Sequence, residues 1–71
     1  MFQFDIQTET IKATDLHSGD VIAQGGFWFT ILTVEPDIKG IHVTVVIGDG
    51  EMFAFTRFFS SVAIVQRRVW N

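Results

Sequence analysis

The sequence predicts an all-β fold: a small, strongly bent antiparallel barrel of five or six strands, SH3-like or OB-like. Residues 27–47 form a central apolar stretch in which two β-rich runs flank a short polar connection, the pattern of an antiparallel hairpin. Glycine-rich turn signals recur along the rest of the chain, and no segment keeps a helical period over ten residues. Closure into a barrel would also remove sheet edges that so apolar a chain must protect.

Chain length and composition predict a single domain, residues 1–71, that forms homo-oligomers. A chain of 71 residues without cysteine has a marginal core and no disulfide to support it. Hydrophobic residues make up 48% of it, with eight Phe and two Trp, which is more apolar surface than so small a domain hides easily. We therefore expect some aromatic side chains to lie at a subunit interface or in a ligand site.

The first strand is expected over residues 2–6, where Phe and Ile alternate with polar residues, and residues 8–12 either extend it or bend away. Residues 13–20 then read as a compact turn. Thr14 or Asp15 would cap a single helical turn, Leu16 would enter the core, and Ser18-Gly19 would supply a backbone position with positive φ.

The next strand is expected over residues 21–24 and is followed by a Gly25-Gly26 hairpin turn. A long strand over residues 27–35 would end at Pro36, and residues 37–40 would form the turn. This long strand is apolar on both faces, so we expect both faces to be covered, the second by another subunit. Its alternation assigns these side chains to two faces: Phe27, Phe29 and Ile31 to one, Trp28, Leu32 and Val34 to the other.

The second half of the chain repeats the pattern. In residues 41–47, one face carries Ile41, Val43, Val45 and Ile47, and the opposite face carries His42, Thr44 and Val46. Residues 48–50 form a Gly-Asp-Gly turn. Residues 51–57 form another alternating strand, residues 58–61 a bend, and residues 62–70 the last strand.

The charge is distributed unevenly. The net charge of −3 argues against general nucleic-acid binding, which depends on neutralising phosphates. Residues 1–51 have a net charge of −6, whereas residues 52–71 contain three arginines and no acid. This predicts either a local cationic face or simply solvated strand edges.

The sequence carries no catalytic or cofactor signature, so we expect a protein that is not an enzyme and has no cofactor or metal. The serines and histidines do not lie in a nucleophile elbow. Asp15, His17 and Asp20 share one loop, but their spacing matches no metal cassette. The glycine pairs are not followed by the Lys-Ser/Thr of a phosphate-binding loop.

Aromatic residues and arginines together indicate a site for a small phosphorylated ligand. Aromatic rings stack planar groups, and arginine makes bidentate contacts with phosphate. Threonines and His42 would bind polar edges of the ligand. The expected ligand-binding residues are Trp28, His42, Phe53, Phe55, Arg57, Arg67 and Arg68, with Trp70 as a further candidate for stacking.

Other roles for these aromatics are a plain core or interface role and base stacking on single-stranded nucleic acid. Phe53-Ala54-Phe55 resembles the aromatic centre of an RNA-binding strand, but Glu51-Met52 stands where that motif has a basic residue and glycine.

The segment Ala-Thr-Asp-Leu-His-Ser-Gly-Asp-Val-Ile at residues 13–22 resembles the A-x-D-L-x-x-G-D-V-I opening of small SH3-like β-barrel proteins of tailed phages. The resemblance continues through the Gly-Gly turn, Trp28, Thr33 to Glu35 and the Val-Thr-Val strand at residues 43–45, and covers most of residues 11–57. Leu-x-x-Gly-Asp also occurs in intein domains, whose catalytic N-terminal Cys or Ser is missing here.

The phage resemblance implies a fold more clearly than a function. Some small phage barrels are similar to proteins that block host defence, including sponges for cyclic nucleotide immune signals. We therefore expect a non-enzymatic protein that sequesters a small phosphorylated ligand, such as a cyclic oligonucleotide, in the host cytoplasm. One alternative is a protein–protein interaction module that inhibits a host protein or joins a phage assembly, and another is single-strand nucleic-acid binding. No signal peptide or membrane-spanning segment is expected.

Overall fold

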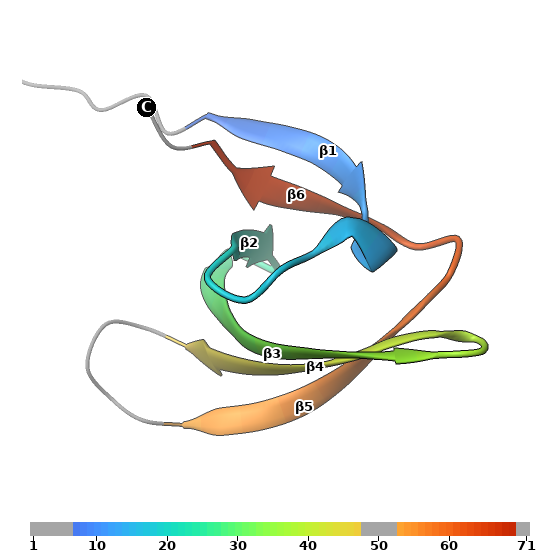
Figure 1. The fold of residues 1–71 in the computed structure, drawn as a ribbon. Helices are drawn as coiled ribbons and strands as arrows, with labels where there is room; N and C mark the ends of the chain where they lie inside the picture. Colours follow the sequence, from blue (N-terminus) through green and yellow to red (C-terminus); the bar gives the residue numbers. More distant parts are fainter. Residues whose placement is uncertain (1–6, 48–52, 70–71) are drawn as a thin grey trace, which may run out of the picture.

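The computed structural model describes residues 7–47 and 53–69, which form one antiparallel sheet, so the all-β prediction is confirmed (Figure 1). A single turn of 3-10 helix, η1, follows the first strand. The elements are β1 (Thr8–Lys12), η1 (Ala13–Asp15), β2 (Val21–Gln24), β3 (Phe27–Asp37), β4 (Gly40–Ile47), β5 (Ala54–Ser60) and β6 (Ile64–Arg68).

The strand order is β1-β6-β2-β3-β4-β5, which brings the last strand into the sheet between the first two. The sheet bends strongly along β3, so that β1 and β6 lie above β4 and β5 in Figure 1. η1 contacts both β4 and β5, and the Ala13 N–H donates to the Ala63 carbonyl over 2.9 Å. The helical turn therefore covers one end of the space enclosed by the bent sheet.

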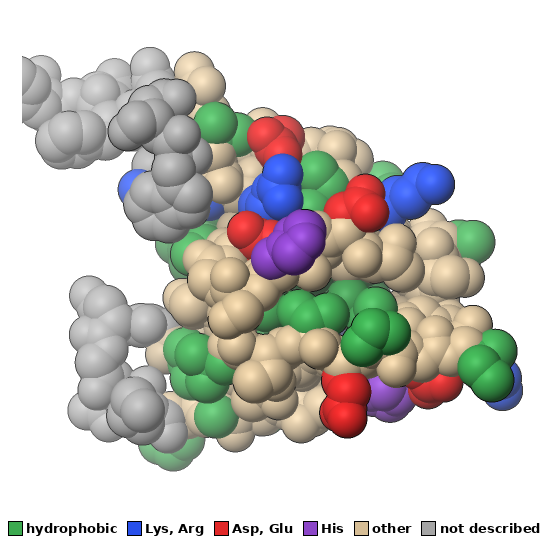
Figure 2. Space-filling model, in the orientation of Figure 1, with side chains coloured by type: hydrophobic (Ala, Val, Ile, Leu, Met, Phe, Trp, Pro, Cys, Tyr) green, Lys and Arg blue, Asp and Glu red, His purple; other side chains and the backbone are tan. Residues whose placement is uncertain are grey.

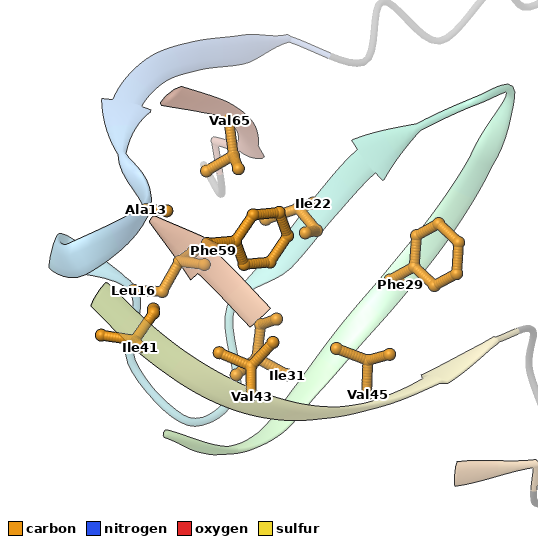
Figure 3. Packing of buried hydrophobic residues seen from close by; sticks show 10 residues of the cluster. All are labelled: Ala13, Leu16, Ile22, Phe29, Ile31, Ile41, Val43, Val45, Phe59 and Val65. Carbon is orange, nitrogen blue, oxygen red and sulfur yellow. The ribbon is translucent and has the colours of Figure 1, made fainter. Parts of the chain in front are cut away.

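The core fills the concave side of this sheet. Side chains from β2, β3, β4, β5 and β6 point inward and meet between the upper and lower strands (Figure 3). The predicted inward face of β4 is confirmed, as is the core position of Leu16, which is 3% exposed. The buried cluster comprises Ala13, Leu16, Ile22, Phe29, Ile31, Ile41, Val43, Val45, Phe59 and Val65.

Glycines with positive φ lie at the turns where the sequence predicts them. Gly25 and Gly26 have φ of 59° and 85° and join β2 to β3, and Gly19 has the expected positive φ of 94°. The central hairpin is confirmed, with Asp37 opposite Gly40 across the turn between β3 and β4. The predicted strand at residues 2–6 and the turn at residues 48–50 lie outside the described residues.

β3 differs from its prediction in two ways. A register shift between Ile31 and Thr33 places Val34 opposite the buried Val43, so the prediction that Val34 shares a face with Trp28 is wrong. Pro36 does not end the strand but pairs with Ile41. β2 accompanies β3 only as far as Thr30, so among residues 7–47 and 53–69 no strand pairs with Pro36 on its other side and needs its missing N–H.

Three other boundaries were predicted wrongly. Residues 58–60 continue β5 rather than bending, and the last strand begins at Ile64, because residues 61–62 form a turn. The residue capping η1 is Lys12, which makes no side-chain cap bond, whereas Thr14 and Asp15 lie within the helical turn.

Candidate functional site

Trp28 and Arg68 meet on the convex face of the sheet. Ala23 of β2 pairs with Trp28 of β3 on one side and with Gln66 of β6 on the other. Directly paired residues of antiparallel strands project from the same face, and Arg68 follows Gln66 by two residues, which keeps it on that face. The Arg68 Cζ lies 5.8 Å from the centre of the Trp28 ring, within cation–π range.

Two threonines of β1 complete this surface. Thr10 pairs directly with Gln66 and Thr8 with Arg68. The Gln66 Nε2 donates to the Thr10 hydroxyl over 2.7 Å, and the Thr8 hydroxyl donates to Gln66 Oε1 over 3.3 Å. We call the surface formed by Thr8, Thr10, Ala23, Trp28, Gln66 and Arg68 the outer platform; it combines an aromatic ring, a cation and neutral hydrogen-bonding groups.

A second group of predicted residues lies on the concave face of β5. The Arg57 Cζ is 5.9 Å from the Phe29 ring centre and 6.0 Å from that of Phe59, so this guanidinium packs among core aromatics. Phe55 meets Phe29 edge to face, with ring centres 5.9 Å apart. Phe53 directly precedes the strand and is 70% exposed.

The Arg67 side chain forms ion pairs with two carboxylates of the same chain. Its guanidinium pairs with the carboxylate of Glu9 and lies 3.5 Å from an Asp20 carboxylate oxygen. The hydrogen bond to Glu9 raises the pKa of Arg67. On the face of the molecule that Figure 2 shows, Lys and Arg side chains lie next to Asp and Glu side chains. With two carboxylates beside it, Arg67 attracts a phosphate less than an unpaired arginine would.

His42 lies on the convex face of β4, apart from the platform. Its Nε2 is 3.0 Å from an Asp37 carboxylate oxygen, and its ring centre is 5.0 Å from that of Phe58. The hydrogen bond from His42 lowers the pKa of Asp37, with a further contribution from the Ile38 N–H. A hydrogen bond with this carboxylate already occupies the His42 Nε2.

The seven predicted site residues therefore occupy four places rather than one. Trp28 and Arg68 meet on the outer platform, and Phe55 and Arg57 share the concave face of β5. Phe53 directly precedes β5 in the sequence. Arg67 and His42 have separate carboxylate partners. Sequence reasoning missed Gln66 and named no individual threonine for the site, because only the pairing of β1 with β6 brings Thr8, Thr10 and Gln66 together. Trp70 lies outside the described residues.

The described part of the chain was compared with the requirements of a metal site and of a membrane-spanning helix. No group of three or more His, Asp and Glu residues there could hold a metal ion, and in the 13–20 turn Asp20 accepts the His17 N–H over 2.8 Å. None of the helical segments at residues 7–47 and 53–69 has the length and apolar character needed to cross a bilayer.

Comparison of the chain with known protein families, with functionally characterised proteins and with solved structures found no match.

Proposed function

We propose that this chain is a non-enzymatic binding protein that sequesters a small phosphorylated ligand with a planar base, such as a cyclic oligonucleotide. The observation that supports this proposal is the Trp28–Arg68 pair on the outer platform. An exposed indole can stack a base, and the neighbouring guanidinium can take a phosphate in a bidentate contact.

The geometry of this pair leaves room for a ligand. A guanidinium lying flat on an indole would approach to about 3.5–4.0 Å, the usual contact distance between carbon atoms. The Arg68 Cζ lies over the Trp28 ring at 5.8 Å from its centre, farther than this contact distance, and Trp28 is 36% exposed. A base can stack on the indole while Arg68 reaches a phosphate attached to it.

The proposal includes the finer fold and the biological setting. We propose that the bent sheet is an SH3-like or OB-like barrel and that copies of the chain associate into a homo-oligomer. The resemblance to tailed-phage barrels suggests a viral protein that acts against host defence in the host cytoplasm. The strong bend along β3 and the contacts of η1 with β4 and β5 support the barrel.

The test is a thermal-shift panel of cyclic di- and trinucleotides, mononucleotides and a short single-stranded DNA, followed by calorimetric titration of any ligand found. A ligand that binds only the native state raises the melting temperature. Trp28→Leu and Arg68→Ala should each weaken binding about tenfold or more, because stacking on one ring contributes about 1–3 kcal/mol.

Matched controls separate the platform from general effects of charge and aromatic content. Phe58→Leu removes another exposed aromatic ring of the convex face, and Lys39→Ala removes another positive charge at a turn. Both should keep the wild-type affinity. Unchanged affinity in Trp28→Leu and Arg68→Ala, with a loss in Arg57→Lys, would move the site to the concave face. Affinity for DNA that falls steeply with salt would instead indicate single-strand binding.

A second candidate function is protein–protein interaction with a host protein or a phage assembly, and a specific apolar surface favours it. Ile38 in the β3–β4 turn is 97% exposed, and Val62 in the β5–β6 turn is 85% exposed. The Ser61 N–H donates to the Lys39 carbonyl over 2.9 Å, which joins these two turns at one end of the molecule (Figure 1). We call Ile38 and Val62 the turn patch.

A further inference from the structure

We propose that β5 pairs with β5 of a second copy of the chain, antiparallel and around a two-fold axis at Thr56, so that two sheets join into one. This inference rests on the homo-oligomer proposed above and names the surface through which it forms. Its starting point is the strand order, which ends with β5, so that no strand within residues 7–47 and 53–69 lies beyond it.

The backbone groups of three exposed residues of β5 point away from β4. The Ser61 N–H donates to the Lys39 carbonyl over 2.9 Å, and β5 pairs with β4 without a register shift. Hydrogen-bonded pairs alternate with non-hydrogen-bonded pairs along an antiparallel ladder, so the odd-numbered residues of β5 are the ones that bond to β4. The N–H and C=O groups of Ala54, Thr56 and Phe58 therefore face outward, and all three residues are exposed.

β5 lacks the features by which edge strands usually avoid pairing, namely short length, proline, lysine and bulges. It has seven residues, and none of them is proline or lysine. An inward-pointing charge can also protect an edge, but the Arg57 Cζ lies 5.9 Å from the Phe29 ring centre and 6.0 Å from that of Phe59, over the strand's own core. The opposite edge, β1, has five residues, which include Glu9 and Lys12. β5 is therefore the edge better suited to receive another strand.

The sequence of β5 selects one register for pairing with itself. When Thr56 lies opposite its own copy, Ala54 lies opposite Phe58, and each pair of outward-facing residues exchanges both of its hydrogen bonds. An axis at Arg57 would instead set two like charges directly opposite each other, which is destabilising. An axis at Phe55 would place Phe58 opposite a residue outside β5. The register centred on Thr56 is therefore the one that satisfies the edge.

The side chains are complementary in this register. Directly paired residues share a face, so on the concave face Arg57 comes opposite Phe55 of the second copy, an aromatic ring that a guanidinium can contact. On the convex face the large Phe58, which is 47% exposed, comes opposite the small Ala54. Phe53, which is 70% exposed, extends the same contact beyond the end of the strand. A second copy of β5 thus covers aromatic side chains that one copy leaves in water.

The first experiment is residue-resolved amide exchange of the full chain over a dilution series. The N–H groups of Ala54, Thr56 and Phe58 should exchange about tenfold or more slowly in concentrated than in dilute protein, because pairing gives them acceptors. The Arg57 N–H is the internal control. It bonds to β4 in a single copy, so its exchange should depend much less on concentration.

Thr56→Pro tests the backbone contact directly. It removes one outward N–H but no hydrogen bond to β4, and proline is accepted at such positions of edge strands. Self-association measured by sedimentation should weaken about tenfold or more, and the concentration-dependent protection should disappear. Thr56→Val is the matched control, because it keeps the N–H and the β-branched shape, and it should associate as the wild-type chain does.

A pair of charge variants tests the two-fold register, in which position 56 meets itself. Thr56→Lys and Thr56→Glu should each weaken association, because each places like charges opposite one another. An equimolar mixture of the two variants should restore association, because opposite charges then meet. A mixture that associates no better than either variant alone overturns the register.

The outcomes separate this inference from the proposals on which it rests. A wild-type monomer overturns both the edge pairing and the homo-oligomer, while ligand binding is decided independently by the thermal-shift panel. An oligomer with rapid exchange at Ala54, Thr56 and Phe58 overturns only the edge pairing and leaves association through another surface, such as the turn patch. Slow exchange at these residues in a monomer also overturns it, because another segment of the same chain then covers β5. Exchange in the wild-type chain decides the matter even if Thr56→Pro does not fold.

Discussion

At Gly40, β4 approaches β5 so closely that only a residue without a β-carbon fits. A β-carbon at this position would lie 1.9 Å from the Phe59 carbonyl oxygen and 2.8 Å from the Ser60 Cα, far inside van der Waals contact. Because both obstacles are backbone atoms, the strands themselves would have to move. We expect Gly40→Ala to lower the free energy of unfolding by about 2–3 kcal/mol in urea denaturation, the upper part of the usual range for overpacking.

Gly26→Ala is the matched control. Gly26 has φ of 85°, but a β-carbon there would meet nothing within 4 Å. Its cost should be only that of a left-handed backbone in a non-glycine residue, about 1–2 kcal/mol. If Gly40→Ala is no more destabilising than Gly26→Ala, then β4 and β5 do not approach as closely as the structure shows.

At the same scale, the sequence predicts which residue types could bind a ligand but not which of them meet. The alternation along each strand is readable, so Trp28 can be placed on the face opposite Phe29. The contact of Trp28 with Arg68 depends on β6 lying beside β2, which is a long-range pairing. No local pattern in the sequence predicts that Arg68 lies over the Trp28 indole or that Arg67 pairs with two carboxylates.

At the scale of elements, the loop before β2 holds the bend in β3. The Gly19 N–H donates to the Ile31 carbonyl and the Ile31 N–H donates to the Asp20 carbonyl, each over 2.8 Å. The Ser18 hydroxyl donates to the Leu32 carbonyl over 2.7 Å, at the register shift itself. The Ser-Gly-Asp part of the segment at residues 18–20 thus has a structural role.

We therefore expect Ser18→Ala to destabilise the fold by about 1 kcal/mol, the usual net contribution of one hydrogen bond. Amide exchange should also become faster around residues 31–33 than in β4. The measurement combines urea denaturation with hydrogen exchange. Ser61→Ala is the control, because Ser61 is an exposed serine in the β5–β6 turn, and it should change neither quantity. Equal effects in both variants would show that the Ser18 hydroxyl does not support the bend.

The β3 register shift also shows where prediction from the sequence ends. The β3–β4 hairpin was predictable because its two runs are adjacent in the chain and flank a turn. The shift was not, because the hydroxyl and amide groups at the bend come from a loop more than ten residues away. Once the register shifts, Val34 changes face, so the strict alternation used for residues 27–35 fails beyond Ile31.

At the scale of the whole molecule, the uncovered apolar side chains are the main feature to explain. Burying one large aliphatic side chain contributes about 1.5–3 kcal/mol, so leaving several in water forgoes a large stabilisation in a chain this small. Ile38 and Val62 lie on neighbouring turns and are almost fully exposed. Association through the turn patch would remove both from water without involving the outer platform.

We accordingly expect light scattering to give a mass above that of one chain for the wild-type protein, and a smaller mass for the double variant Ile38→Asp, Val62→Asp. Each aspartate replaces an apolar contact by a charge that must be desolvated, so association should weaken more than tenfold. The double variant should keep its β-sheet circular dichroism and its nucleotide affinity.

Leu32→Asp is the control, since it introduces a charge at a side chain that is 40% exposed but outside the turn patch. A wild-type monomer at micromolar concentration would contradict association. A monomer that captures one host protein, with capture lost in the double variant, would instead assign the turn patch to a protein partner.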